Sequence, residues 1–128
     1  MLAVTSIYAA LITGIFLWLS LRVIQYRLGK RVSIGDEGHS KLQRRARAQA
    51  NCAEYAPLGL LLMALLEIQG VPVLAMHVLG LMLLIGRALH AYGFSASPEI
   101  MQARRAGMIL TLFMLTFSAI ALLFYGLF

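Results

Sequence analysis

Long apolar runs alternate with short polar segments along this chain. Three of the runs contain no Lys, Arg, Asp or Glu: residues 1–21, 68–86 and 106–128. Each is long enough to cross about 30 Å of hydrocarbon, because an α-helix rises about 1.5 Å per residue. A fourth uncharged run, 55–66, reaches that length only if the polar residues before it continue the same helix. The pattern therefore predicts four membrane-spanning helices.

Glycine and proline residues between the runs predict where the helices begin and end. We expect helices over about 2–28, 40–69, 73–94 and 98–127. Gly29 would end the first helix, Ser40 is a candidate N-cap for the second, and Pro98 suits the first position of the fourth. Short connections favour an all-α integral membrane protein, an up-down four-helix bundle that forms one domain over 1–128.

The charged residues add an orientation to this bundle. Only 12% of the residues are charged, whereas soluble domains have about 25%. The net charge of +6 comes from 11 Lys and Arg residues, all in or near the first and third connections between helices. The positive-inside rule places both connections in the cytoplasm and both termini outside. Nucleic-acid binding is excluded, because it would need a soluble basic face with aromatic side chains.

The first apolar run is expected to stay in the mature protein. A cleaved signal peptide carries its positive charge before its apolar core, whereas here the first basic residue, Arg22, follows the run. Cys52 is the only cysteine, which excludes an intrachain disulfide and leaves it as a small packing residue.

Polar residues crowd the start of the second membrane helix, in the segment RRARAQANCAEYAPLG over residues 44–59. Arg47, Asn51 and Glu54 are spaced i, i+4, i+7, so they share one helix face, with Tyr55 beside them. An ionisable carboxylate at a membrane boundary is costly unless it is paired or faces water. The face therefore suits a zwitterionic ligand with more than one carboxylate and an ammonium group.

Other polar residues at the same membrane depth leave alternatives open. On the third helix, Arg87, His90 and Phe94 follow i, i+3, i+7, and both ionisable groups fit either helix packing or a site. Gln49 points away from the Asn51 face. Several basic residues are interpreted as topology determinants or lipid-headgroup contacts: Arg31, Lys41, Arg44 and Arg45.

The segment RAQANCAEYAPL, residues 47–58, closely resembles the second-helix signature of the MAPEG family, the membrane-associated proteins of eicosanoid and glutathione metabolism. The leukotriene-C synthase branch has the most similar form of this signature. RVIQYRLGKRVS and GRALHAYGF resemble the end of the first helix and part of the third helix in that branch, and the four-helix plan matches over the whole chain. The glycine-rich first connection is similar to that of bacterial members.

This resemblance implies a homotrimer in a bacterial inner membrane, with glutathione bound between adjacent subunits on the cytoplasmic side. Glutathione would be a co-substrate, and no metal is implied. By position, the glutathione contacts are Arg27, Arg47, Gln49, Asn51, Glu54, Tyr55, His90 and Arg104. The resemblance assigns activation of the thiol to Arg104, with Arg105 as the alternative.

The implied activity is that of a glutathione transferase or peroxidase. A guanidinium stabilises the thiolate, which is the nucleophilic form, and the thiolate attacks a lipophilic electrophile or hydroperoxide from the bilayer. Two positions depart from the leukotriene branch: Leu28 replaces an arginine proton donor, and Phe94 replaces a tyrosine glutathione contact. Alternatives are a non-catalytic ligand-binding member of the family and, less favoured, a small multidrug exporter, which would need a carboxylate in the first helix.

Overall fold

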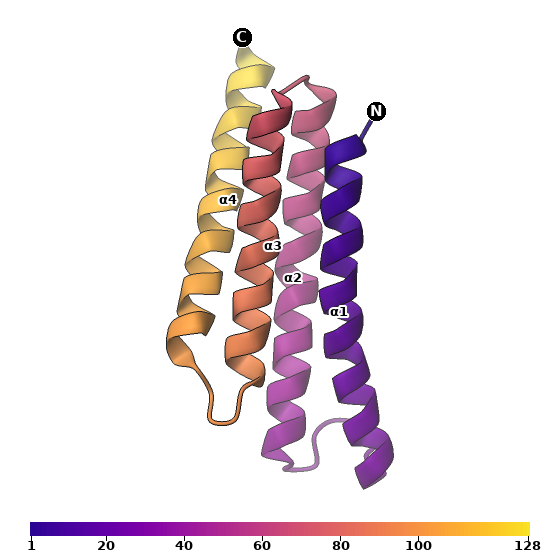
Figure 1. Ribbon diagram of the computed structural model, residues 1–128. Coiled ribbons are helices and arrows are strands. Elements are labelled where there is room, and N and C mark those ends of the chain that lie inside the picture. The colour runs from indigo at the N-terminus through magenta and orange to yellow at the C-terminus, as the bar shows by residue number, and fades with distance from the viewer.

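The protein is a bundle of four long helices, described here from a computed structural model that covers residues 1–128. Helix α1 comprises Ala3–Lys30, α2 Ser40–Ile68, α3 Val73–Ser95 and α4 Met101–Leu127. The helices run alternately up and down, and α2 and α3 occupy the centre (Figure 1). Helices α1 and α4 lie on opposite sides and do not pack against each other. The up-down four-helix bundle expected from the sequence is confirmed.

Each of the four helices is long and apolar enough to cross a membrane. Large apolar side chains such as Leu17, Leu61, Leu81 and Phe117 are exposed on the outer faces of α1, α2, α3 and α4. Lipid is the solvent that such surfaces require, because aqueous exposure of apolar area is unfavourable. The chain is therefore a multi-pass membrane protein.

Both termini and the α2–α3 connection lie at one end of the bundle, and the two longer connections lie at the other (Figure 1). Connections 31–39 and 96–100, with the helix ends that they join, carry the basic residues, so we call this the basic end. At the opposite end the Glu67 carboxylate accepts hydrogen bonds from the backbone nitrogens of Val4 and Thr5, at 2.9 and 2.8 Å. A carboxylate at a helix N-terminus satisfies free N–H groups and favourably opposes the helix dipole.

The expected start of the fourth helix at Pro98 is wrong, because α4 begins at Met101. The backbone nitrogen of Ile100 donates to the carbonyl oxygen of Gly93 at 3.0 Å, which turns the connection back onto the end of α3. Ile100 then has non-helical dihedral angles, φ −98° and ψ 89°, and its carbonyl accepts the first bond of α4 from Arg104.

Two other boundaries also differ from the sequence-based expectation. Helix α1 continues through Gly29 to Lys30 and ends where Arg31 adopts a left-handed conformation with φ 57°. Ser40 is the first residue inside α2, and His39 takes the N-cap position without a capping side-chain bond. Arg31, rather than Gly29, therefore takes the left-handed conformation that ends this helix.

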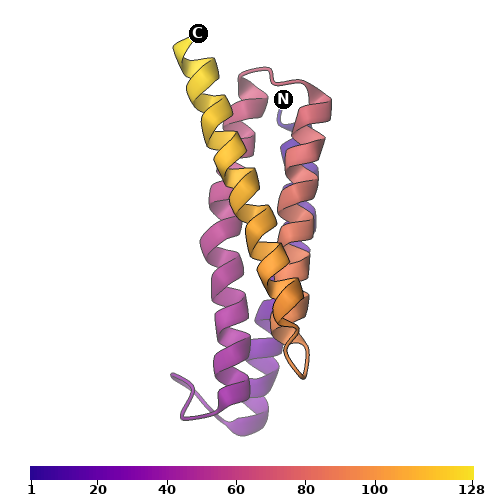
Figure 2. The ribbon, with the colours of Figure 1, turned by 90° about the vertical axis from the view of Figure 1, so that its left-hand side faces the viewer.

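Helices α3 and α4 approach most closely through glycines. A Cβ atom at Gly107 of α4 would lie 2.5 Å from the carbonyl oxygen of Gly86 and from the backbone nitrogen of His90. Toward its C-terminus α4 leans away from α3 (Figure 2), leaving an apolar cavity of about 580 Å³ between them. Small residues allow close contact between membrane helices, as the sequence indicated for Gly80, Gly86 and Gly93. The tight contact places the polar residues of α2, α3 and α4 side by side near the basic end.

Candidate functional site

A buried arginine joins three helices in the basic half of the bundle. Arg87 of α3 has only 1% of its surface exposed. Its Nη1 atom donates to Asn51 of α2 at 2.6 Å, while Nε and Nη2 donate to the Thr111 hydroxyl of α4 at 3.1 and 2.8 Å. The Thr111 hydroxyl donates in turn to the carbonyl oxygen of Gly107 at 2.8 Å. These bonds fix the guanidinium plane between α2 and α4.

No carboxylate is among the partners of Arg87. Its partners are an amide oxygen, a hydroxyl and the Met108 sulfur, which lies 3.3 Å from Nη2. The ring of Tyr55 adds a cation–π contact, with its centroid 5.4 Å from the guanidinium carbon. A buried cation without a neutralising anion is electrostatically costly and attracts negative charge to its vicinity.

An exposed ion pair occupies the neighbouring part of α2. Arg47 Nη1 lies 3.9 Å from Glu54 Oε1, and the two side chains are 60% and 54% exposed. Both residues are therefore available to a ligand that approaches from outside the subunit. Together with Asn51 and Tyr55 they form what we call the α2 polar face. The shared face expected from the i, i+4, i+7 spacing is present in the structure.

A second group of polar residues lies where α3 meets α4. His90 is 3% exposed, and its ring packs at a tilt on Phe94 with 5.7 Å between the centroids. The guanidinium of Arg104 lies over the Phe94 ring, and its carbon is 4.0 Å from the ring centroid. Arg104 also forms a salt bridge with Glu99. Glu99 therefore neutralises part of the positive charge of Arg104.

Arg105 differs from Arg104 in its surroundings. It is exposed, and none of the hydrogen bonds or salt bridges of the structure involve it. Both arginines line a shallow, mainly apolar cavity of about 340 Å³ with Met101, Met108 and Ile109. An apolar substrate could lie in this cavity next to either guanidinium.

Two of the residues selected from the sequence lie away from the others. Arg27 Nη1 donates to the carbonyl oxygen of Gly35 at 2.9 Å, in the connection after α1. Gln49 Nε2 donates to the Ser20 hydroxyl at 2.9 Å, between α2 and α1. The folded chain therefore gathers Asn51 and Tyr55 around Arg87 but does not bring Arg27 or Gln49 to them.

The α2 polar face is also not enclosed by other parts of the chain. None of the four main cavities is lined by its members, Arg47, Asn51, Glu54 and Tyr55. No group of three or more His, Cys, Asp or Glu side chains is placed to hold a metal ion. Cys52 is buried at 3% exposure in the apolar core, consistent with a packing role.

Of three further polar residues in this region, only Arg87 was singled out from the sequence, whereas Glu99 and Thr111 were not. Arg87 was left between packing and function, yet its position inside an apolar helix was a usable signal. Glu99 is the only carboxylate between residues 68 and 128, although nothing in its spacing indicated a partner. Thr111 carries no sequence signal, because hydroxyls commonly bond to the backbone of their own helix.

Comparisons with known proteins bear on the whole chain. The family model for MAPEG matches residues 5–124. The inner membrane protein YecN of Escherichia coli strain K12 is 35% identical over 122 residues, which cover 95% of this chain and 92% of that protein. YecN of Escherichia coli O6:H1 shows the same identity and coverage. The match to the family model and the similarity to YecN both extend over nearly the whole chain, so the chain belongs to the MAPEG family.

Proposed function

We propose that this protein is a membrane-bound glutathione-dependent transferase or peroxidase. The observation that carries the proposal is the buried Arg87, which has no carboxylate partner and lies against Asn51 and Tyr55 of the α2 polar face. The exposed ion pair on the same face adds one cation and one anion. This combination complements a ligand that has more negative than positive groups.

Glutathione has this chemistry, because it carries carboxylates at both ends, one ammonium group and a thiol. Arg47 presents a planar guanidinium that binds a carboxylate through paired hydrogen bonds. Glu54 accepts the ammonium group, and opening the Arg47–Glu54 pair costs little because exposed ion pairs contribute only about 0–1 kcal/mol. The excess positive potential from Arg87 favours the remaining carboxylate or the thiolate.

Arg104 is the residue proposed to activate the thiol. A free thiol has a pKa of about 8.5 and is mostly protonated at neutral pH, so an adjacent guanidinium raises the reactive thiolate fraction. The thiolate sulfur forms a bond to the electrophilic carbon, the leaving group departs with its electron pair, and the thiol proton passes to water. With a hydroperoxide, two glutathione molecules become a disulfide while the O–O bond is reduced to an alcohol and water.

The proposed site is completed by a neighbouring subunit. Arg27 and Gln49 lie on the α1 side of the bundle, away from Asn51, and the α2 polar face has no wall of its own. A homotrimer would bring the α1 side of one subunit against the α2 polar face of the next. We place the protein in the inner membrane with the basic end and the site facing the cytoplasm, as the positive-inside rule favours.

A second candidate is a member of the family that binds glutathione or a lipid without turnover. The observation in its favour is the salt bridge between Arg104 and Glu99, which already neutralises the proposed activating group. Binding to the α2 polar face would persist in such a protein, whereas thiolate formation would not. Binding and thiolate formation must therefore be measured separately.

The test uses purified protein in detergent. Glutathione binding is measured by calorimetry, thiolate formation by ultraviolet difference absorbance, and turnover with an aryl halide and an alkyl hydroperoxide. Arg104→Ala should abolish the thiolate signal and reduce turnover at least about tenfold, while the matched variant Arg105→Ala retains both. Absence of glutathione binding would refute the proposal, and binding without thiolate or turnover would establish the second candidate.

A further inference from the structure

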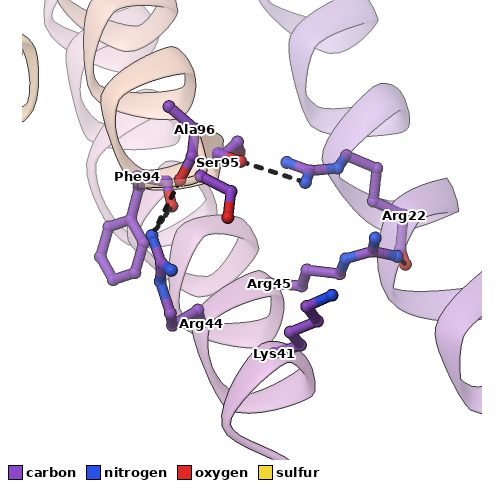
Figure 3. A pocket seen from close by; sticks show the side chains of 8 residues that line it. Arg22, Lys41, Arg44, Arg45, Phe94, Ser95 and Ala96 are labelled. Carbon is purple, nitrogen blue, oxygen red and sulfur yellow. Dashed lines mark hydrogen bonds between the residues drawn. The ribbon is translucent and has the colours of Figure 1, made fainter. Parts of the chain in front are cut away.

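A cavity at the basic end gathers four positively charged side chains from two helices. Its volume is about 150 Å³, and Arg22 of α1 faces Lys41, Arg44 and Arg45 of α2 across it. Figure 3 shows these side chains around one space, bounded on the remaining side by the end of α3, with the Ser95 hydroxyl directed into it. We call this cavity the basic pocket.

No carboxylate lines the basic pocket. The nearest recorded ion pair is between Arg44 and Glu99, with 3.9 Å between Nη2 and Oε2, and the same carboxylate is held by Arg104. Like charges in one cavity repel each other, and the repulsion is strong where water is partly excluded. Apart from this contact between Arg44 and Glu99, no carboxylate of the chain pairs with the cluster, which therefore retains an excess of positive charge.

Backbone carbonyls hold the guanidinium groups in place around the pocket. Arg44 Nη2 donates to the carbonyl oxygens of Phe94 and Ala96 at 3.2 and 3.0 Å, and Arg22 Nη2 donates to that of Ser95 at 3.4 Å. Arg45 Nη1 donates to the carbonyl oxygen of Arg22 at 2.7 Å. Each bond uses only part of a guanidinium fork, so the side chains are oriented while donors remain free.

Some of the remaining polar atoms are shielded from solvent and unpaired. Arg22 Nη1, Arg44 Nε and Ser95 Oγ are inaccessible and have no hydrogen-bond partner. Unsatisfied buried donors are costly, particularly on charged groups, so the hydrogen bonds within the chain compensate the burial of Arg22 and Arg44 only in part. The charged side chains that line the pocket come from both α1 and α2, so a suitable ligand must offer acceptors in several directions.

We propose that the basic pocket binds a phosphate group. A phosphate presents oxygen atoms tetrahedrally and carries up to two negative charges, which match donors and cations arriving from several sides. A carboxylate has two coplanar oxygens and one charge, so it would leave part of the cluster unsatisfied. Lys41, Arg44 and Arg45, interpreted from the sequence as topology determinants or lipid-headgroup contacts, thereby become parts of a defined site.

Two sources supply this group at a membrane boundary: a soluble phosphate monoester and the headgroup of an anionic phospholipid. Basic pockets between membrane helices commonly bind lipid headgroups. The site does not depend on the proposed glutathione chemistry, because Arg47 and Glu54 are not among its lining residues. Its two sources can be distinguished by separate binding measurements on the same protein.

The decisive variant is Arg22→Gln combined with Lys41→Gln. Lys41 makes no hydrogen bond or salt bridge in the structure, so Lys41→Gln alone serves as a second variant that should fold normally. The matched control is Lys30→Gln combined with Arg31→Gln, which removes the same charge from exposed positions at the same end. Thermal unfolding in Tris–chloride buffer establishes that each variant is folded before binding is measured.

The soluble arm titrates delipidated protein in detergent with sodium phosphate at constant ionic strength. Wild type and control should show a saturable rise in Tm, and the pocket variant should bind at least about tenfold more weakly. The lipid arm uses nanodiscs of phosphatidylcholine with or without phosphatidylglycerol, and native mass spectrometry counts retained phosphatidylglycerol.

Each outcome decides the proposal. Selective phosphate binding identifies the soluble source, and selective phosphatidylglycerol retention without a phosphate response identifies the lipid source. If neither occurs, or if pocket and control variants lose binding equally, the pocket is no phosphate site. Sodium acetate that binds as tightly as sodium phosphate would overturn the assignment of phosphate as the ligand.

Discussion

Arg87 is the residue that most constrains the interior near the basic end. Three of its guanidinium nitrogens donate to Asn51 and Thr111, and the Tyr55 ring lies against it. A buried cation held only by neutral partners depends on each of them, since losing one leaves a charged donor unsatisfied. The hydrogen bond from Arg87 Nη1 to Asn51 Oδ1 is the shortest of these contacts, at 2.6 Å.

Replacement of Asn51 should separate hydrogen bonding from packing. Asn51→Leu removes the acceptor for Arg87 and should lower the free energy of unfolding by about 2 kcal/mol. Asn51→Asp keeps the shape and supplies the missing negative charge, so it should unfold at or above the wild-type Tm. Thermal unfolding in detergent measures both variants, and an equal loss for both would show that Arg87 does not require this acceptor.

Glu99 is the residue expected to restrain Arg104. Its carboxylate pairs with the guanidinium that we propose as the thiol activator. Glu99→Gln removes a negative charge near the thiolate, so the pKa of bound glutathione should fall and the thiolate signal should persist to lower pH. Ultraviolet titration of the glutathione complex measures this pKa, with Glu37→Gln in the first connection as a control; an unchanged pKa would mean that Glu99 does not act on Arg104.

At the scale of the elements, the contact between α3 and α4 determines where the polar residues lie. Gly86 and Gly107 bring the two backbones together, which places His90 beside α4 and Thr111 beside Arg87. The sequence indicated the small residues of α3 but not their partner on α4. Spacing within one helix identifies a face, whereas the neighbour of that face depends on how two helices cross.

Enlarging Gly107 should therefore disturb stability and the site together. A Cβ atom there would meet backbone atoms of Gly86 and His90 at 2.5 Å, and backbone cannot move aside as a flexible side chain can. Gly107→Ala should lower stability by about 1–3 kcal/mol, as overpacking does. Gly126→Ala on the same helix is the control, since its Cβ would meet nothing within 4 Å; equal Tm values for the two variants would contradict this account.

At the scale of the whole molecule, one subunit leaves the proposed site divided. Arg27 and Gln49 bond on the α1 side, whereas Arg47, Asn51 and Glu54 lie on the α2 polar face. Closed symmetric oligomers bring different surfaces of identical chains together in every interface of a ring. The trimer proposed here would assemble one site from two subunits, three times around its axis.

Mixing inactive subunits tests this arrangement. Arg27→Ala and Glu54→Ala damage different halves of the site, so a statistical mixture of the two should recover about a quarter of the wild-type turnover. The control mixture of Arg47→Ala with Glu54→Ala damages the same half twice and should recover none. Co-expression, purification and an aryl-halide assay measure the recovery, and equal turnover in both mixtures would contradict a shared site.

Three properties follow from the sequence alone: the membrane class, the four spans and the face that joins Arg47, Asn51 and Glu54. These properties depend on local periodicity and on apolar length, which are readable without knowing any neighbour. Helix boundaries were harder to predict from the sequence. The turn at Ile100 depends on its hydrogen bond to Gly93 across the α3–α4 connection, and residue preferences do not indicate such a bond.

The folded structure determines which polar groups meet. It placed Thr111 and Asn51 on Arg87, paired Glu99 with Arg104, and gathered basic residues of α1 and α2 into one pocket. These partners lie on different helices, and their meeting depends on the depth and rotation of each helix in the bundle. Spacing along one helix carries no information about either quantity, so long-range polar contacts required the folded chain.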